Sequence, residues 1–315
     1  MSITFRNSRL ETFKFSSKTY IYPNVPFDIK KEISRLCRIH SELKIIQDVD
    51  IEEQGIFQFL QASYLREVWV TESVTSMSYG NTEEVAIQVV EGVSKKPDFV
   101  SDKQWQTLIN INDALDYLKA FRDPSLVSDI TFSVDLLKSV HRIVGKNIIE
   151  NAGEFRITEV GAAGTSVVYC PHKLVSKKIV ELISFVNNAV VDASHMSDSD
   201  RLSRMIQVAA LFFSGFLLIH PFSNGNGRTC RLLVNLLLFP VTIVPFSIFL
   251  DVDREEYLRI LISSQQCRNH DALMMLFLVS AMRTANIANF LFLTTEDSEF
   301  VSNSLCEACS FCIAT

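Results

Sequence analysis

The sequence predicts a mainly α-helical protein with one short β-hairpin. Apolar residues recur at three- and four-residue spacing through most of the 315-residue chain, and only 10 glycines and 8 prolines interrupt them. The run 158–169 is instead rich in β-branched residues and is broken by Gly161 and Gly164, which is typical of a hairpin. Because 48% of the residues are hydrophobic, the chain can bury a sizeable core.

The N-terminal part is expected to be irregular to about Pro26 and helical beyond it. The helices predicted there cover 28–45, 52–70, 83–93 and 102–121. Phe57, Leu60 and Tyr64 of the second helix are interpreted as core residues. A break rich in Ser, Thr, Gly and Asn follows over 71–82, and Ser101 is expected to cap the fourth helix.

The remaining helices are predicted over 133–145, 173–191, 198–218, from near Gly227 to about Phe239, 255–264 and 271–293. His141 in the first of these is interpreted as a structural or surface residue. The uncharged stretch 232–250 is long enough to span a membrane. Because Pro240 and Pro245 would break a helix there, we expect a short buried helix followed by extended chain.

A polar loop joins two apolar runs at 220–231, with the sequence HPFSNGNGRTCR. Gly225 and Gly227 allow close approach of a ligand, and a helix starting near Gly227 would favour an anion at its N-terminus. Arg228 and Arg231 share one helix face and can together neutralise a di- or triphosphate. His220 is a candidate base. Each feature alone has a structural explanation, but their conjunction indicates a phosphate site.

This segment resembles the Fic motif, HxFx(D/E)GNGRxxR, at every fixed position except the acidic one. The segment NAGEFR at 151–156 and the Val-His-Arg at 140–142 are also similar to the family, and the resemblance spans roughly residues 50–290. It implies a Fic-type helical bundle whose hairpin flap holds a target protein as an added strand. The flap residues implied are Gly161, Gly164, Val167 and Tyr169.

The resemblance implies a protein adenylyltransferase, which moves AMP from ATP to a Ser, Thr or Tyr hydroxyl of a target protein and releases pyrophosphate. His220 would take the hydroxyl proton, and Phe222 would anchor the loop. The phosphate-binding residues implied are Gly225, Asn226, Gly227, Arg228 and Arg231. The expected partners are ATP, an unidentified protein target, and Mg²⁺ or Mn²⁺.

Asn224 is the departure from the motif, because the family has Asp or Glu there as a metal ligand. An amide keeps one oxygen but loses the negative charge that Mg²⁺ favours, so metal binding should be weakened. The change leaves two alternatives open. The donor could differ, as in branches of the fold that transfer UMP, phosphocholine or phosphate, or the chain could be a catalytically silent scaffold that only binds a partner.

A second comparison concerns inhibition. Many members of the family carry an inhibitory helix, (S/T)xxxE(G/N), whose Glu pairs with the second motif arginine. The best match here begins at Thr75 and has Tyr79 in place of that Glu. Arg231 would then lack its usual carboxylate partner. Tyr79 could still block sterically, a shifted register could bring in Glu72, Glu83 or Glu84, or the segment could be a cap and turn with no regulatory role.

Three cysteines crowd the C-terminus at Cys306, Cys309 and Cys312. A structural zinc takes four ligands, so three do not predict one. Cys312 also opens a C-a-a-X sequence, and Cys306 and Cys309 could accept palmitate. Lipidation at these residues would place the chain on the cytosolic face of a membrane. A frayed tail is the preferred interpretation.

The remaining observations concern location and organisation. No secretory signal is visible at the start, so a cytoplasmic location is expected. The net charge of −6 gives no reason to expect nucleic acid. We expect an extension over 1–50, a helical part over 51–130, a core over 131–293 and a tail over 294–315.

Overall fold

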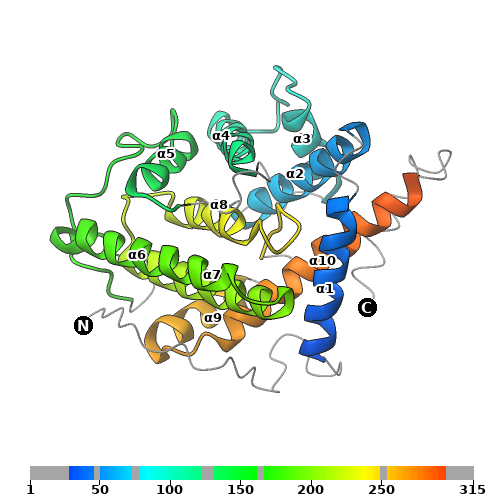
Figure 1. The fold of residues 1–315 in the computed structure, drawn as a ribbon. Coiled ribbons are helices and arrows are strands. Elements are labelled where there is room, and N and C mark those ends of the chain that lie inside the picture. The colour runs from blue at the N-terminus through cyan, green and yellow to red at the C-terminus, as the bar shows by residue number, and fades with distance from the viewer. Residues whose placement is uncertain are drawn as a thin grey trace.

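The computed structural model describes residues 28–45, 50–72, 79–122, 131–161, 167–248 and 254–295. Within these ranges the chain is built from α-helices, which confirms the mainly α prediction (Figure 1). They are α1 (Ile29–Ile45), α2 (Asp50–Glu72), α3 (Tyr79–Val90), α4 (Asp102–Lys119), α5 (Val134–Val144), α6 (Val175–Ser194), α7 (Asp198–Ile219), α8 (Asn226–Leu238), α9 (Arg254–Cys267) and α10 (Asp271–Thr295). Two short 3₁₀ turns, Ala120–Arg122 and His172–Leu174, adjoin α4 and α6.

Local signals place several helix ends. The Ser101 hydroxyl accepts the backbone N–H of Gln104, and the Gln104 side chain accepts the Ser101 N–H, so a complete capping box starts α4. The Ser133 hydroxyl accepts the backbone N–H of Leu136 and so caps the start of α5, and Gly145 ends that helix. The predicted helix 83–93 lies instead at Tyr79–Val90, because the chain turns at Gly92 with φ of 71°.

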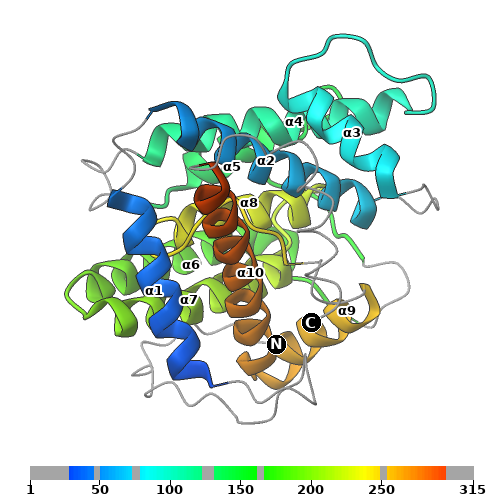
Figure 2. The ribbon, with the colours of Figure 1, turned by 90° about the vertical axis from the view of Figure 1, so that its right-hand side faces the viewer.

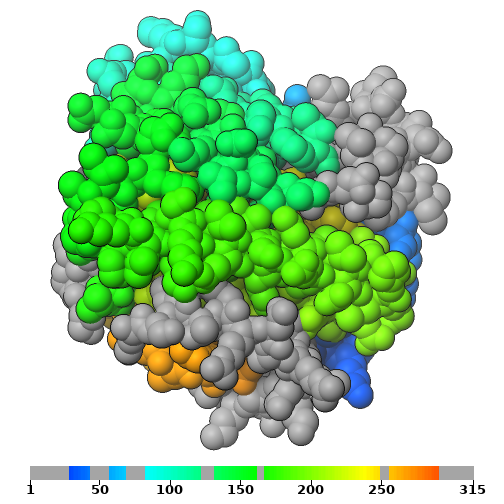
Figure 3. Space-filling model, turned by 60° about the vertical axis from the view of Figure 1, so that its left-hand side comes forward, coloured from blue at the N-terminus to red at the C-terminus, as the bar shows by residue number. Residues whose placement is uncertain are grey.

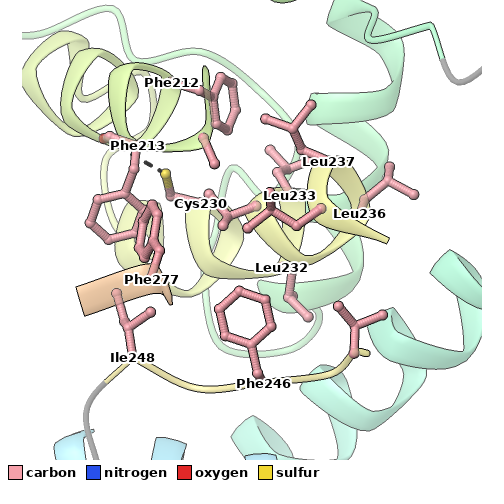
Figure 4. Close-up of a cluster of buried hydrophobic side chains, with 14 of the residues drawn as sticks. Phe212, Phe213, Cys230, Leu232, Leu233, Leu236, Leu237, Phe246, Ile248 and Phe277 are labelled. Carbon is pink, nitrogen blue, oxygen red and sulfur yellow. Dashed lines mark hydrogen bonds between the residues drawn. The ribbon is translucent and has the colours of Figure 1, made fainter. Parts of the chain in front are cut away.

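The helix α8 forms the centre of the molecule. It packs against α7 on one side and against α4 and α5 on the other (Figure 1). Its side chains are buried almost all round, which is the pattern of a fully enclosed helix. Cys230, Leu233 and Leu237 of α8 lie in one apolar cluster with Phe213 of α7 and Phe277 of α10 (Figure 4).

The outer helices complete the bundle around α8. Helix α10 packs against α7, α2 and α9 and runs beside α1 (Figure 2). Helices α5 and α6, in green, cover much of one face (Figure 3). The helix α7 and the first 20 residues of α10 are apolar and long enough to cross a membrane, and most of each is buried in the bundle. The helix within the apolar stretch 232–250 ends at Leu238, as the prolines predicted.

The predicted β-hairpin is not seen in the described residues. The described parts of the predicted hairpin, 158–161 and 167–169, form no strand. Together with the residues that flank them they make two arms, 155–161 and 167–171. The backbone N–H of Arg156 donates to the carbonyl of Pro221 at 2.9 Å, and that of Cys170 donates to the carbonyl of Leu218 at 3.2 Å. The bases of the two arms are thus bonded to the end of α7 and to the loop after it. Thr75, Gly164 and the cysteines at 306, 309 and 312 lie outside the described residues.

Candidate active site

The site begins where α7 ends at His220. This residue adopts the left-handed conformation, with φ of 52° and ψ of 62°, and its backbone N–H bonds to the carbonyl of Phe216 at 2.8 Å. The chain then turns through Pro221 to Gly225, the N-cap of α8. Gly225 has φ of 74°, and an added Cβ would lie 3.0 Å from Ile149 Cδ1. The left-handed conformation therefore favours glycine there, and an added Cβ would also force the end of the Ile149 side chain to shift. The free N–H groups of the first turn of α8 follow directly.

The imidazole of His220 is held as a neutral base. Its Nδ1 lies 3.3 Å from the carbonyl oxygen of Leu217, and a carbonyl only accepts, so Nδ1 carries the proton and Nε2 carries the lone pair. Burial lowers the pKa of His220 to about 4, and the nearby Arg156 guanidinium adds to this effect. The ring is therefore uncharged at neutral pH, with Nε2 able to accept a proton.

Tyr169 lies against the catalytic candidate. Its ring stacks on the His220 ring with the centroids 3.9 Å apart and an angle of 19° between the planes. Burial raises the pKa of the Tyr169 hydroxyl, so the phenol is neutral. The prediction placed Tyr169 among the flap residues that hold a target. In the structure its ring contacts His220, while its neighbour Val168 is 81% exposed.

His141 joins three parts of the site. The backbone N–H of Gly153 donates to His141 Nδ1 at 2.8 Å, which leaves the proton on Nε2 for the carbonyl of Asn224 at 2.9 Å. The ring also stacks on buried Phe222, with centroids 3.6 Å apart and planes 3° apart. Burial lowers the pKa of His141 to about 4. His141 is structural, as interpreted from the sequence, but it specifically positions the motif loop.

Arg156 fixes the end of α7. Its buried guanidinium donates to the carbonyls of His220 at 2.7 Å and Ile219 at 3.3 Å, and also to those of Thr158 and Cys170. One cation therefore satisfies the last carbonyls of a helix, where positive charge is favoured. The same side chain ties both arms, 155–161 and 167–171, to the residue that carries the candidate base.

Asn226 is committed to the loop. Its side-chain NH₂ donates to the carbonyl of Phe222 at 2.8 Å, and its oxygen accepts the Phe222 N–H at 2.9 Å. The side chain is buried and both its ends are used. It stabilises the turn before α8, so only the backbone N–H of Asn226 stays available for the predicted phosphate contact.

A cleft of about 390 Å³ opens beside the motif. Asn224 and Arg228 line it from the motif, Ile148 and Ile149 from the loop after α5, and Val68 from α2. The remaining wall is α4, which contributes Ser101, Lys103, Gln104, Thr107 and Leu108. Arg228 is 92% buried, since only 8% of its surface is exposed. The lining of the cleft thus combines apolar side chains with polar and cationic ones.

The two motif arginines have different surroundings. Arg231 lines a small separate cavity with Asn235 and Phe246, and its guanidinium lies close to Gly227. The hydroxyl of Tyr64, which is fully buried on α2, is a hydrogen-bond partner of Arg231. Burial raises the pKa of Tyr64 even though the guanidinium opposes that rise. Only Arg228 lines the cleft together with Asn224.

Two of the three acidic residues considered as substitutes for the inhibitory Glu have other partners in the described structure. Glu83 lies 3.7 Å from Arg66, and Glu84 accepts a bond from Gln88 at 3.2 Å. Tyr79 is the first residue of α3.

Sequence reasoning assigned no individual role to Arg156 or Lys103. The sequence pointed to Arg156 through the NAGEFR segment, which resembles the family. It gave no indication of Lys103, because Lys103 lines the same cleft as Arg228 only through the packing of α4 on α8.

The geometry defines a helical bundle in which a histidine ends one helix and a short loop leads from it to the N-terminus of the central helix. The comparisons identify the family that shares this arrangement. A model of the Fic/DOC family matches residues 131–238. A Fido domain-containing protein of Dictyostelium discoideum is 33% identical over 114 residues, which are 36% of this chain and 72% of that protein. The chain belongs to the Fic/DOC family.

Two other relatives are much longer. A ribonucleoside-diphosphate reductase small chain of Ostreid herpesvirus 1 is 32% identical over 193 residues, or 58% of this chain and 30% of that protein. Protein adenylyltransferase fic-1 of Caenorhabditis briggsae is 30% identical over 115 residues, or 35% and 20%. The chain thus spans less than a third of either relative.

A solved structure shares the fold. Fic-1 from C. elegans superposes with a TM-score of 0.62 at 17% identity, covering 84% of this chain and 73% of that one. This likeness extends well beyond the residues 131–238 that the family model matches.

Proposed function

We propose that this chain transfers AMP from ATP to a hydroxyl group of a target protein. The observation that carries the proposal is the protonation state of His220, which ends α7 just before the loop to α8. The ring is neutral, its Nδ1 is held by the carbonyl of Leu217, and its Nε2 is able to accept a proton. The proposal is supported by curated relatives that are named protein adenylyltransferases.

In the proposed reaction Nε2 of His220 takes the proton of the target hydroxyl while its oxygen attacks the α-phosphorus of ATP. A new P–O bond forms, the bond from the α-phosphorus to the bridging oxygen breaks, and pyrophosphate leaves with the electron pair. The N–H groups at the start of α8 and the Arg228 guanidinium, which lines the cleft, would neutralise charge on the phosphates. The protein contributes position and electrostatics.

The target would bind next to His220. Ile157 is 83% exposed and Val168 is 81% exposed, and they lie on the two arms that Arg156 ties to the end of α7. Exposed apolar side chains at such a place favour contact with a protein. The Ser, Thr or Tyr to be modified would enter between them.

The test is transfer of label from α-labelled ATP, with UTP, GTP and CTP in parallel, to the chain itself and to proteins of a cell lysate. We expect label from ATP in the native chain and none in His220→Ala. Label from another nucleotide would replace ATP as the donor. ATP binding without any transfer would contradict the proposal and favour a binding scaffold.

We also propose that the chain lacks the inhibitory Glu of its family. Tyr79 holds that position in the sequence, at the start of α3. A carboxylate placed there could pair with a motif arginine and displace a phosphate, so Tyr79→Glu should lower the transfer rate, by about tenfold or more if the pair forms. The control is Tyr79→Gln, because glutamine has nearly the size of glutamate but no charge. Equal rates in Tyr79→Glu and the native chain would contradict the proposal.

A further inference from the structure

The cleft beside the motif has an unusual balance of charge for a site whose family uses a metal ion. Its lining includes two cations, Lys103 and Arg228, and neither an aspartate nor a glutamate. A cleft lined by one sign of charge concentrates the opposite charge within it. It is therefore suited to a polyanion such as the triphosphate of a nucleotide.

The residues present do not fit a Mg²⁺ or Mn²⁺ site. At the metal-ligand position of the motif, Asn224 offers one neutral oxygen, and that oxygen already accepts the N–H of Gly225 at 2.7 Å. These ions prefer anionic oxygen ligands. Among the described residues, no cluster of His, Cys, Asp and Glu could hold a metal ion. The described residues that line the cleft therefore provide no carboxylate for an ion to bind between protein and phosphate.

Lys103 provides positive charge on the wall that α4 forms. It is the second residue of α4, two positions after the Ser101 cap, and is exposed where it lines the cleft. An ammonium on a flexible four-carbon stem can follow a phosphate group as a mobile point charge. Arg228, which also lines the cleft, is buried. Together the two side chains can neutralise two phosphate charges.

We infer that the cleft binds the polyphosphate of the donor without a divalent cation, with Lys103 supplying charge that a metal ion supplies elsewhere in the family. This inference rests on the proposed function and names how that site recognises its donor. The inference also explains why residue 224 is a neutral asparagine. A carboxylate at that position would repel the negatively charged donor unless a metal ion bound with it.

The experiment measures binding of ATP, and separately of inorganic tripolyphosphate, by titration calorimetry in EDTA and in Mg²⁺. The His220→Ala background prevents turnover. We expect Kd values in the two conditions to agree within about threefold, and Lys103→Ala to raise Kd in EDTA by about tenfold. Lys103→Arg should restore most of the affinity. Asn224→Asp should weaken binding in EDTA by about tenfold and make it depend on Mg²⁺.

The matched control is Lys177→Ala, which removes an exposed lysine from α6, far from the residues that line the cleft. The inference would be overturned if the His220→Ala chain without further changes lost ATP binding in EDTA. It would also be overturned if Lys103→Ala and Lys177→Ala bound ATP equally well. Either result would leave the proposed function standing. Absence of ATP binding in both conditions would overturn the two together. Circular dichroism of each variant excludes unfolding as the cause.

Discussion

At the scale of single residues, the orientation of His220 depends on two contacts: the carbonyl of Leu217 holds Nδ1, and the Tyr169 ring covers one face of the imidazole. A base must be aimed as well as unprotonated, since misplacement of a reacting group lowers the rate. Tyr169 is thus a positioning residue.

Two substitutions of Tyr169 should distinguish the contribution of its ring to the rate from that of its hydroxyl. Tyr169→Phe keeps the stacked ring and should keep kcat within about twofold, whereas Tyr169→Ala frees the imidazole and should lower kcat by about tenfold. Without the ring, His220 is also more hydrated, so its pKa should rise from about 4 toward its ordinary value. The pH profile of kcat/KM should then fall off at a higher pH in Tyr169→Ala. An unchanged profile would contradict the positioning role.

His141 makes stability depend on pH. Its pKa of about 4 in the folded chain lies below the ordinary value of 6.5, so the unfolded chain binds the proton more tightly. The stabilisation is complete above pH 6.5 and is lost as the pH falls toward 4. At pH 5 the free energy of unfolding should be lower than at pH 7 by about 2 kcal/mol from this residue alone.

Urea unfolding at pH 7 and pH 5 checks this prediction. The variant His141→Phe keeps a flat ring against Phe222 but cannot titrate. It should be less stable at pH 7, because Gly153 and Asn224 lose their hydrogen-bond partner, yet its stability should fall less on acidification. A fall equal to that of the native chain would show that His141 is not the titrating group.

At the scale of elements, α7 and α8 form a helix-loop-helix whose loop is held by side-chain hydrogen bonds. Asn226 of α8 bonds to the carbonyl of Phe222 in the loop. His141 and Arg156, from other segments, bond to the carbonyls of Asn224 and His220. Arg156 is the only side chain described that bonds to the carbonyls of both Ile219 and His220. The end of α7, and with it the backbone of the candidate base, therefore depends on one guanidinium.

Arg156→Ala should lower the free energy of unfolding by about 3 kcal/mol or more, because several buried carbonyls lose a charged donor at once. Arg156→Lys should recover only part of it, since an ammonium cannot reproduce the planar set of donors. The control is Arg38→Ala, which removes an exposed arginine whose partner is Glu42 on the same helix and should change stability by less than about 0.5 kcal/mol. Chemical denaturation measures all three, and equal effects of Arg156→Ala and Arg38→Ala would refute the capping role.

At the scale of the whole molecule, stability comes from the helices packed around α8. Phe277 of α10 meets Phe213 of α7 edge to face, with centroids 5.5 Å apart at 87° (Figure 4). Both rings are fully buried. This contact ties α10 to the helix that ends at His220.

Phe277→Ala should therefore cost about 3–5 kcal/mol of folding free energy through lost apolar burial and the cavity left behind. Phe290 on the same helix is 42% exposed, so Phe290→Ala should cost far less. Thermal or urea unfolding compares the two. A small effect of Phe277→Ala would mean that α10 is not an integral part of the core.

Local patterns along the chain determined the helices and the motif. Periodic apolar residues place a helix without reference to the rest of the chain, as in α7, and a cap such as Ser101 acts over three residues. The helix after His220 was also predictable, because the glycines and the apolar run that follows are contiguous.

Only the tertiary structure decided which side chains meet at the site. His141 reaches Asn224 across 83 positions of sequence, and Lys103 shares a cleft with Arg228 of another helix. The arms predicted as a hairpin bond at their bases to the end of α7, because Arg156 offers donors there that no local pattern reveals. Such contacts depend on how the helices pack around α8, and packing is a property of the whole chain.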